Sequence, residues 1–124
     1  MATNCKCLHD VFLKDKTWIH RGGKVSNYYI PESIEQLIEV GRMLYLENRD
    51  FVAVGHTSNL YFKNSFNINS IVDTKQLTAF NILDDKTLVA DCGAHMSKLS
   101  QYCVENGFVG YEGMINLPGT VGGA

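Results

Sequence analysis

A β-rich run, an amphipathic helix and a second β-rich run follow one another in the first half of this chain, and their order constrains the fold more than any other feature. Residues 24–30 predict a first strand, which Pro31 ends. Residues 34–47 predict the helix, and residues 51–55 predict a buried strand with apolar residues on both faces, as in a parallel sheet. The first half therefore predicts a layered fold of helix on sheet.

Local signals in the sequence support the helix. Ser33 and Gln36 have the spacing of a capping box at its start, and Asn48 suits its end. Gly41 would let the apolar face of the helix approach a sheet closely. The apolar positions expected to share that face are Ile34, Leu37, Ile38, Leu44 and Tyr45.

The second half of the chain predicts shorter elements. Residues 70–73 suit a short strand, and residues 79–83 and 87–92 flank a turn, which predicts a β-hairpin. Ser97 would cap a second helix over residues 98–105. Gly107 is well placed to end that helix.

These elements predict an α+β fold of two small lobes joined near Lys75. We expect residues 1–20 to form an N-terminal tail, residues 21–74 a first lobe, and residues 75–124 the start of a second lobe.

Composition excludes several classes of function. The chain has 124 residues, 45% of them hydrophobic and 19% charged, which is typical of a globular domain. A net charge of -2 gives no surplus of Lys and Arg, so we expect neither a nucleic-acid partner nor a membrane partner. The N-terminus lacks the apolar stretch of a signal peptide, which predicts a cytoplasmic protein with free cysteines.

A cysteine cluster near the N-terminus is the only hint of metal binding in the sequence. Cys5, Cys7 and His9 follow a C-x-C-x-H pattern. A zinc site needs four ligands, and no second pair of Cys or His follows at a suitable spacing. We therefore expect no metal site.

The predicted strand 51–55 opens directly into a polar loop. The loop contains Gly55, His56, Thr57, Ser58 and Asn59. Successive backbone N–H groups at such a bend can form an anion site, to which Ser and Asn side chains add donors. Taken alone, however, a strand end of this composition is more often a simple turn.

The chain also carries a glycine-rich run, Leu117 to Ala124. Its sequence, Leu-Pro-Gly-Thr-Val-Gly-Gly-Ala, suggests backbone that adopts unusual torsions or approaches a ligand closely. It is neither a P-loop nor a G-x-G-x-x-G dinucleotide fingerprint. Spacing alone does not assign it a purpose.

Read together, four segments resemble successive motifs of the UDP-N-acetylenolpyruvoylglucosamine reductase family. The segments are PESIEQL, AVGHTSNLYF, VADCGAHMSKLSQYCVENGFVGYEGM and LPGTVGGA, in that order. The resemblance runs from about Arg21 to Ala124 and covers only the first, FAD-binding part of that enzyme. The family uses NADPH and FAD to make UDP-N-acetylmuramate for bacterial peptidoglycan.

The resemblance implies a two-lobed FAD-binding domain with the flavin between the lobes and the second lobe incomplete. It implies that the loop after the strand faces the pyrophosphate of FAD, and that two further segments line the cofactor. His95 would then lie near the flavin. The residues carried over as cofactor-binding are Gly55, His56, Thr57, Ser58, Asn59, Gly93, Ala94, Pro118, Gly119, Thr120, Gly122, Gly123 and Ala124.

Two departures from the family pattern bear on cofactor affinity. His56 and Thr57 stand where the family usually has glycines, and Asn116 stands where it usually has another. A side chain at a positive-φ position costs roughly 1–2 kcal/mol. His56 would offset part of this cost by donating a hydrogen bond to the cofactor.

The family's catalytic arginine, serine and glutamate have no match in this sequence, so we assign no catalytic residue. Three hypotheses follow: an enzyme fragment that binds FAD and is inactive alone, a binding module with a degenerate FAD site, and an α+β association domain. A chain that stops within the glycine-rich run would leave sheet edges unpaired, which favours self-association.

Overall fold

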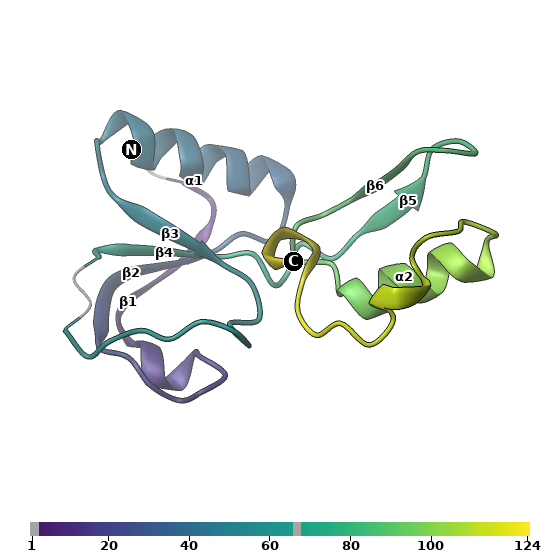
Figure 1. Ribbon diagram of the computed structural model, residues 1–124. Helices are drawn as coiled ribbons and strands as arrows, with labels where there is room; N and C mark the ends of the chain where they lie inside the picture. Colours follow the sequence, from purple (N-terminus) through teal and green to yellow (C-terminus); the bar gives the residue numbers. More distant parts are fainter. Residues whose placement is uncertain (1–2, 66–67) are drawn as a thin grey trace.

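The computed structural model describes residues 3–65 and 68–124, so two residues of the expected tail (1–2) and two of the expected first lobe (66–67) lie outside the described part. The described elements form two groups (Figure 1). One is a four-stranded sheet with helix α1, and the other is a hairpin with helix α2. The C-terminal segment runs between the two groups. The predicted α+β class is confirmed.

The larger sheet has the strand order β1-β2-β4-β3. Its first two strands pair antiparallel, while β4 pairs parallel with both β2 and β3. The parallel pairing predicted for residues 51–55 is therefore correct. The strands are β1 (Lys6–Phe12), β2 (Lys24–Ile30), β3 (Phe51–Val54) and β4 (Ser70–Asp73).

Strand β1 lies within residues 1–20, which were expected to form an N-terminal tail, so part of that segment belongs to the sheet. Cys7 pairs with Tyr29 and Leu8 with Tyr28 across the ladder. Polar His9 and Asp10 interrupt its β-rich composition, so local propensity does not show the strand. Its pairing with β2 supplies the hydrogen bonds that stabilise it.

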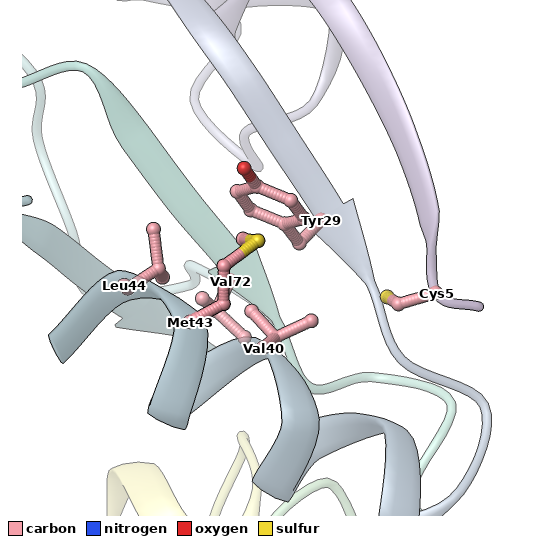
Figure 2. Close-up of a cluster of buried hydrophobic side chains, with 6 residues drawn as sticks. All are labelled: Cys5, Tyr29, Val40, Met43, Leu44 and Val72. Carbon is pink, nitrogen blue, oxygen red and sulfur yellow. The ribbon is translucent and has the colours of Figure 1, made fainter. Parts of the chain in front are cut away.

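Helix α1 (Ile34–Leu46) covers one face of this sheet, as Figure 2 shows. Successive strand residues point to opposite faces, so Tyr29 and Val72 face the helix. The helix meets them with Val40, Met43 and Leu44. Cys5 completes this cluster, with Cys7 and Leu37 partly buried against it.

The buried face of α1 differs from the predicted one. Ile34, Ile38 and Tyr45 are exposed, and a Cβ at Gly41 would meet nothing within 4 Å. Gly41 therefore does not permit a close approach to the sheet. The cause is a rotation of the buried stripe toward Val40 and Met43, two positions that the predicted face omitted.

Both ends of α1 match their sequence signals. The Ser33 hydroxyl accepts from the Gln36 N–H, and the Gln36 side chain accepts from the Glu32 N–H. At the other end Asn48 has a φ of 51°, and its N–H donates to Tyr45 O while the Arg49 N–H donates to Leu44 O. This is the paired pattern of a Schellman motif.

The opposite face of the sheet carries a second core. Tyr28 and Ile71 point into it with Leu13, Val25, Val54 and Phe62. Strand β4, which is central, is buried along its whole length, whereas β3 lies at the edge and buries only Val54 fully. The expectation that residues 51–55 are buried on both faces is therefore wrong, because its edge position leaves that strand partly uncovered.

The second group contains the predicted hairpin, β5 (Phe80–Ile82) with β6 (Leu88–Ala90), and helix α2 (Met96–Glu105). The N-cap of α2 is His95 and makes no side-chain cap bond, so Ser97 lies inside the helix and does not cap it. Gly107 ends the helix with a φ of 78°, as predicted. Three short 3-10 helices complete the described elements: η1 (Leu13–Asp15), η2 (Glu112–Met114) and η3 (Val121–Gly123).

Within the described residues, no helix has the length and apolar character needed to cross a membrane.

Candidate functional site

The carboxyl ends of the parallel strands β3 and β4 meet at one edge of the sheet. The backbone N–H and the hydroxyl of Thr74 both donate to the Val54 carbonyl, at 2.9 and 3.0 Å. This pairing joins the two strand ends where the loop 55–60 begins. Ligands of open α/β sheets bind beyond the carboxyl ends of the strands, so this edge is the first place to seek a site.

The glycine-rich C-terminal segment lies against the residues that precede α2. The Met96 N–H donates to Gly119 O at 3.2 Å, and the Val121 N–H donates to Ala94 O at 2.9 Å. His95 and Thr120 form an isolated antiparallel bridge between them. Backbone hydrogen bonds therefore hold the glycine-rich segment in place.

Two positions in the site require glycine because a side chain would strike a neighbouring segment, and a third requires it because of its backbone torsion. A Cβ at Gly55 would overlap the Thr120 side chain, and one at Gly122 would lie 2.8 Å from the Cys92 Cβ. Gly119 has a φ of 112°, a torsion that L-residues rarely adopt. The glycine pattern thus permits the loop after β3, the segment before α2 and the C-terminal segment to meet.

These segments enclose a cavity of about 750 Å³, within the size range of small-molecule sites. Gly93 and Ala94 lie outside its lining, since Gly93 is packed against the carbonyls of Thr74 and Leu77. The other predicted residues all line it: Gly55, His56, Thr57, Ser58, Asn59, Pro118, Gly119, Thr120, Gly122, Gly123 and Ala124. Their contact with a cofactor remains a prediction.

Sequence reasoning missed several lining residues, notably Thr74 and Cys92. Thr74 directly follows β4, and the parallel pairing of β3 with β4 would have indicated it. Cys92 precedes the predicted residue Gly93 and lies against Gly122. The further lining residues are Ala53, Val54, Leu60 and Leu117.

Thr57, which the motifs set against a glycine of the family, has a φ of 56°, the left-handed region that glycine adopts most easily. Its hydroxyl accepts from the Trp18 N–H at 2.9 Å and donates to the His56 carbonyl at 2.7 Å. These bonds offset part of the torsional cost of a side chain here. His56 does not have positive φ, so it carries no such cost.

The His56 imidazole lies in the cavity wall beside a second histidine. Its ring centroid is 4.3 Å from that of His95, and its Nε2 is buried with no hydrogen-bond partner among the described residues. Burial lowers the pKa of His56, positive charge on His95 and Lys75 lowers it further, and Asp73 opposes these effects. The surroundings of the ring therefore favour its neutral form.

Asp73 is the carboxylate that acts on this pair, and both of its oxygens already bond to other groups. Its Oδ2 accepts from the Tyr28 hydroxyl at 2.8 Å and lies 3.2 Å from the Lys75 Nζ. Its Oδ1 accepts from the Lys75 N–H. Burial and the Asp73 charge raise the pKa of Tyr28 well above its ordinary value, so its hydroxyl stays a donor.

Metal ligands do not gather in the described part of the chain. No group of three or more His, Cys, Asp or Glu residues there is placed to hold an ion. Cys5 is buried in the core and Cys7 lies partly buried, while His9 is exposed and pairs with Asn27.

Comparison with known proteins identifies the class of this chain. Residues 25–124 match the model of the FAD binding domain family, and the chain belongs to that family. Among curated relatives, it is similar to UDP-N-acetylenolpyruvoylglucosamine reductase of Caldicellulosiruptor bescii, with 34% identity over 94% of this chain. It is 31% identical over 98% of its length to the same enzyme of Caldicellulosiruptor saccharolyticus. The resemblance proposed from the motifs is thereby confirmed.

Solved structures share the fold. UDP-N-acetylenolpyruvylglucosamine reductase of Thermus caldophilus matches 99% of this chain with a TM-score of 0.64 and 22% identity. Cholesterol oxidase of B. sterolicum matches 86% with a TM-score of 0.61 and 8% identity. FAD is the cofactor to which the family points, as the motifs predicted.

The chain covers only part of each of these proteins. It spans 37% and 39% of the two curated reductases and 41% of the Thermus caldophilus structure.

Proposed function

We propose that this chain binds FAD with its diphosphate in the cavity between residues 55–59 and residues 117–124. The observation that carries the proposal is the meeting of these two segments at the carboxyl ends of β3 and β4. Ser58 and Asn59 are exposed there and offer side-chain donors. Each hydrogen bond to a charged oxygen is worth about 1.5–3 kcal/mol.

The residues present fit a diphosphate group. Close packing at Gly55 and Gly122 lets the segments that form the cavity wall approach one another. Thr57 holds the loop in its positive-φ conformation through its bond to Trp18. Gly93 and Ala94 support the wall from behind in this proposal, rather than contacting the cofactor.

We further propose that the complete protein is a reductase like its curated relatives, with NADPH as reductant and an enolpyruvyl sugar nucleotide of peptidoglycan synthesis as substrate. FAD, when bound, supplies the hydride chemistry. The share of this chain is to bind and orient the cofactor, with residues 21–74 and 75–124 as its two lobes. We place the protein in the cytoplasm, and its four free cysteines agree with a reducing compartment.

The test is cofactor retention. The purified chain is mixed with FAD, free cofactor is removed, and the visible absorption spectrum is recorded. Trp18 is the only tryptophan, and its backbone is bonded to Thr57 in the site, so quenching of its fluorescence gives the dissociation constant. We expect a stoichiometric flavin band and saturable quenching.

Matched variants locate the site. Ser58→Ala and Asn59→Ala should each raise the dissociation constant roughly tenfold, because each removes a donor to a charged group. Ser65→Ala, which also changes an exposed loop residue but lies outside the cavity, should leave it unchanged. A colourless, folded chain would contradict FAD binding, and equal effects of all three variants would contradict the assigned site.

A further inference from the structure

We propose that His56 and His95 form a proton-binding pair that makes the flavin-nucleotide site bind its diphosphate more tightly as the pH falls. This inference rests on the proposed function and adds a regulatory property to the same site.

Geometry is the first support. His56 lines the cavity, and His95 lies against its ring at 4.3 Å between centroids. The two come from separate parts of the chain: His56 follows β3, and His95 is the N-cap of α2. The backbone of His95 is bridged to Thr120 of the C-terminal segment, which helps to fix its position.

Among the described residues, the carboxylate that acts on the charge of His56 already bonds to other groups. Asp73 faces it from the end of β4, but this carboxylate is already bonded to Tyr28 of β2 and to Lys75. Positive charge on Lys75 and His95 disfavours the imidazolium form of His56, and Cys92 lines the same cavity. His56 lines the cavity, so a negative charge bound there would lie close to its ring.

A diphosphate diester supplies that charge. It stays doubly anionic across neutral pH, so its charge close to the ring favours the imidazolium form. Burial and nearby cations lower the pKa of His56 in the free chain, and a bound anion raises it again. Binding then takes up a proton from solvent, and His95 acts as a positioning residue behind the ring.

The sign of the pH dependence follows from linkage. A ligand-bound pKa above the free pKa means that affinity rises as the pH falls through the bound value, and levels off below the free value. For one proton the change is at most about tenfold in dissociation constant for each pH unit. We expect FAD to bind at least roughly fivefold more tightly at about pH 5.5 than at about pH 8.

The experiment measures FAD affinity of the full chain across this range, by Trp18 fluorescence and by calorimetry in two buffers of different ionisation enthalpy. The wild-type chain should take up at least about 0.4 proton at the midpoint of the profile, which is the maximum that a fivefold change in affinity implies. In His56→Gln, whose side chain keeps a donor but cannot be charged, the proton uptake should fall and the pH dependence of the affinity should weaken. His9→Gln, at an exposed position on the opposite edge strand β1, should behave as the wild type.

A second variant tests the pair itself. His95→Gln should shift the midpoint of the wild-type profile to higher pH, because His56 loses a neighbouring positive charge. A purely structural role of His95 would weaken binding equally at every pH. Histidine proton resonances of the wild-type chain, followed by NMR with and without FAD, give the protonation of His56 without depending on any variant.

The outcomes separate this inference from the proposed function. Equal pH profiles in wild type and His56→Gln, or an NMR signal showing neutral His56 in the complex, would overturn the pair while FAD binding stands. If FAD does not bind at all, the proposed function fails. ADP-ribose, a diphosphate diester without flavin, then decides the pair: binding that depends on pH through His56 supports it, and no binding overturns it.

Discussion

At the scale of single residues, Thr57 shows how this chain departs from its family without losing the loop conformation. Glycine is the usual residue where φ is positive, yet Thr57 holds φ at 56° with two hydrogen bonds from one hydroxyl. The torsional cost depends on the Cβ and the compensation on the Oγ1. The two effects can therefore be separated by substitution.

Thr57→Ala and Thr57→Gly both remove the hydroxyl, but only the glycine variant also removes the strain. We expect Thr57→Ala to be less stable than Thr57→Gly by about 1 kcal/mol in free energy of unfolding. Both should be less stable than the wild type if the hydroxyl bonds outweigh the strain. Urea denaturation measures these differences, and equal stability of the two variants would refute positive-φ strain at this position.

At the scale of elements, the two helices begin by different means. Ser33 caps α1 through its hydroxyl, which accepts from the Gln36 N–H at 3.3 Å. In α2 the N-cap is His95 without a side-chain cap bond, and its backbone is instead bridged to Thr120. The start of α1 is therefore stabilised by residues close in sequence, whereas the start of α2 is bonded to the C-terminal segment.

The difference predicts opposite results for two serine substitutions. Ser33→Ala should lower the free energy of unfolding by about 1 kcal/mol, the usual worth of an N-cap. Ser97→Ala should change it little, because Ser97 lies within α2 and alanine favours the helix interior. Thermal unfolding followed by circular dichroism checks both, and a loss at Ser97 equal to that at Ser33 would contradict the assigned caps.

At the scale of the whole molecule, the cavity lies between the end of the sheet and the C-terminal segment, so a ligand bound there would stabilise contacts between distant parts of the chain. FAD at about 100 times its dissociation constant should add about 2.7 kcal/mol to the free energy of unfolding. For a chain of this size the melting temperature should rise by roughly 10 °C.

Riboflavin is the matched control for this measurement, because it carries the flavin ring but neither diphosphate nor adenosine. At the same concentration it should shift the melting temperature much less. Equal shifts by FAD and riboflavin would show that the diphosphate cavity is not the main source of affinity. Self-association through sheet edges stays a prediction, for which the edge strands β1 and β3 are the candidates.

Local sequence signals were sufficient to predict the elements whose ends are marked by capping or turn residues. The capping box at Ser33, the αL residues Asn48 and Gly107, and the hairpin of β5 and β6 all occupy their predicted places. Each depends on residues close together in the chain, so short-range propensity describes it.

Long-range packing settled the rest. Strand β1 exists because it pairs with β2, the buried stripe of α1 follows the sheet beneath it, and β3 is exposed because it lies at an edge. In the site, the motifs indicated most of the cavity wall, but Thr74, Cys92 and the contact of His56 with His95 arise from segments far apart in sequence. Such contacts follow from burial and pairing in three dimensions, which residue order alone does not express.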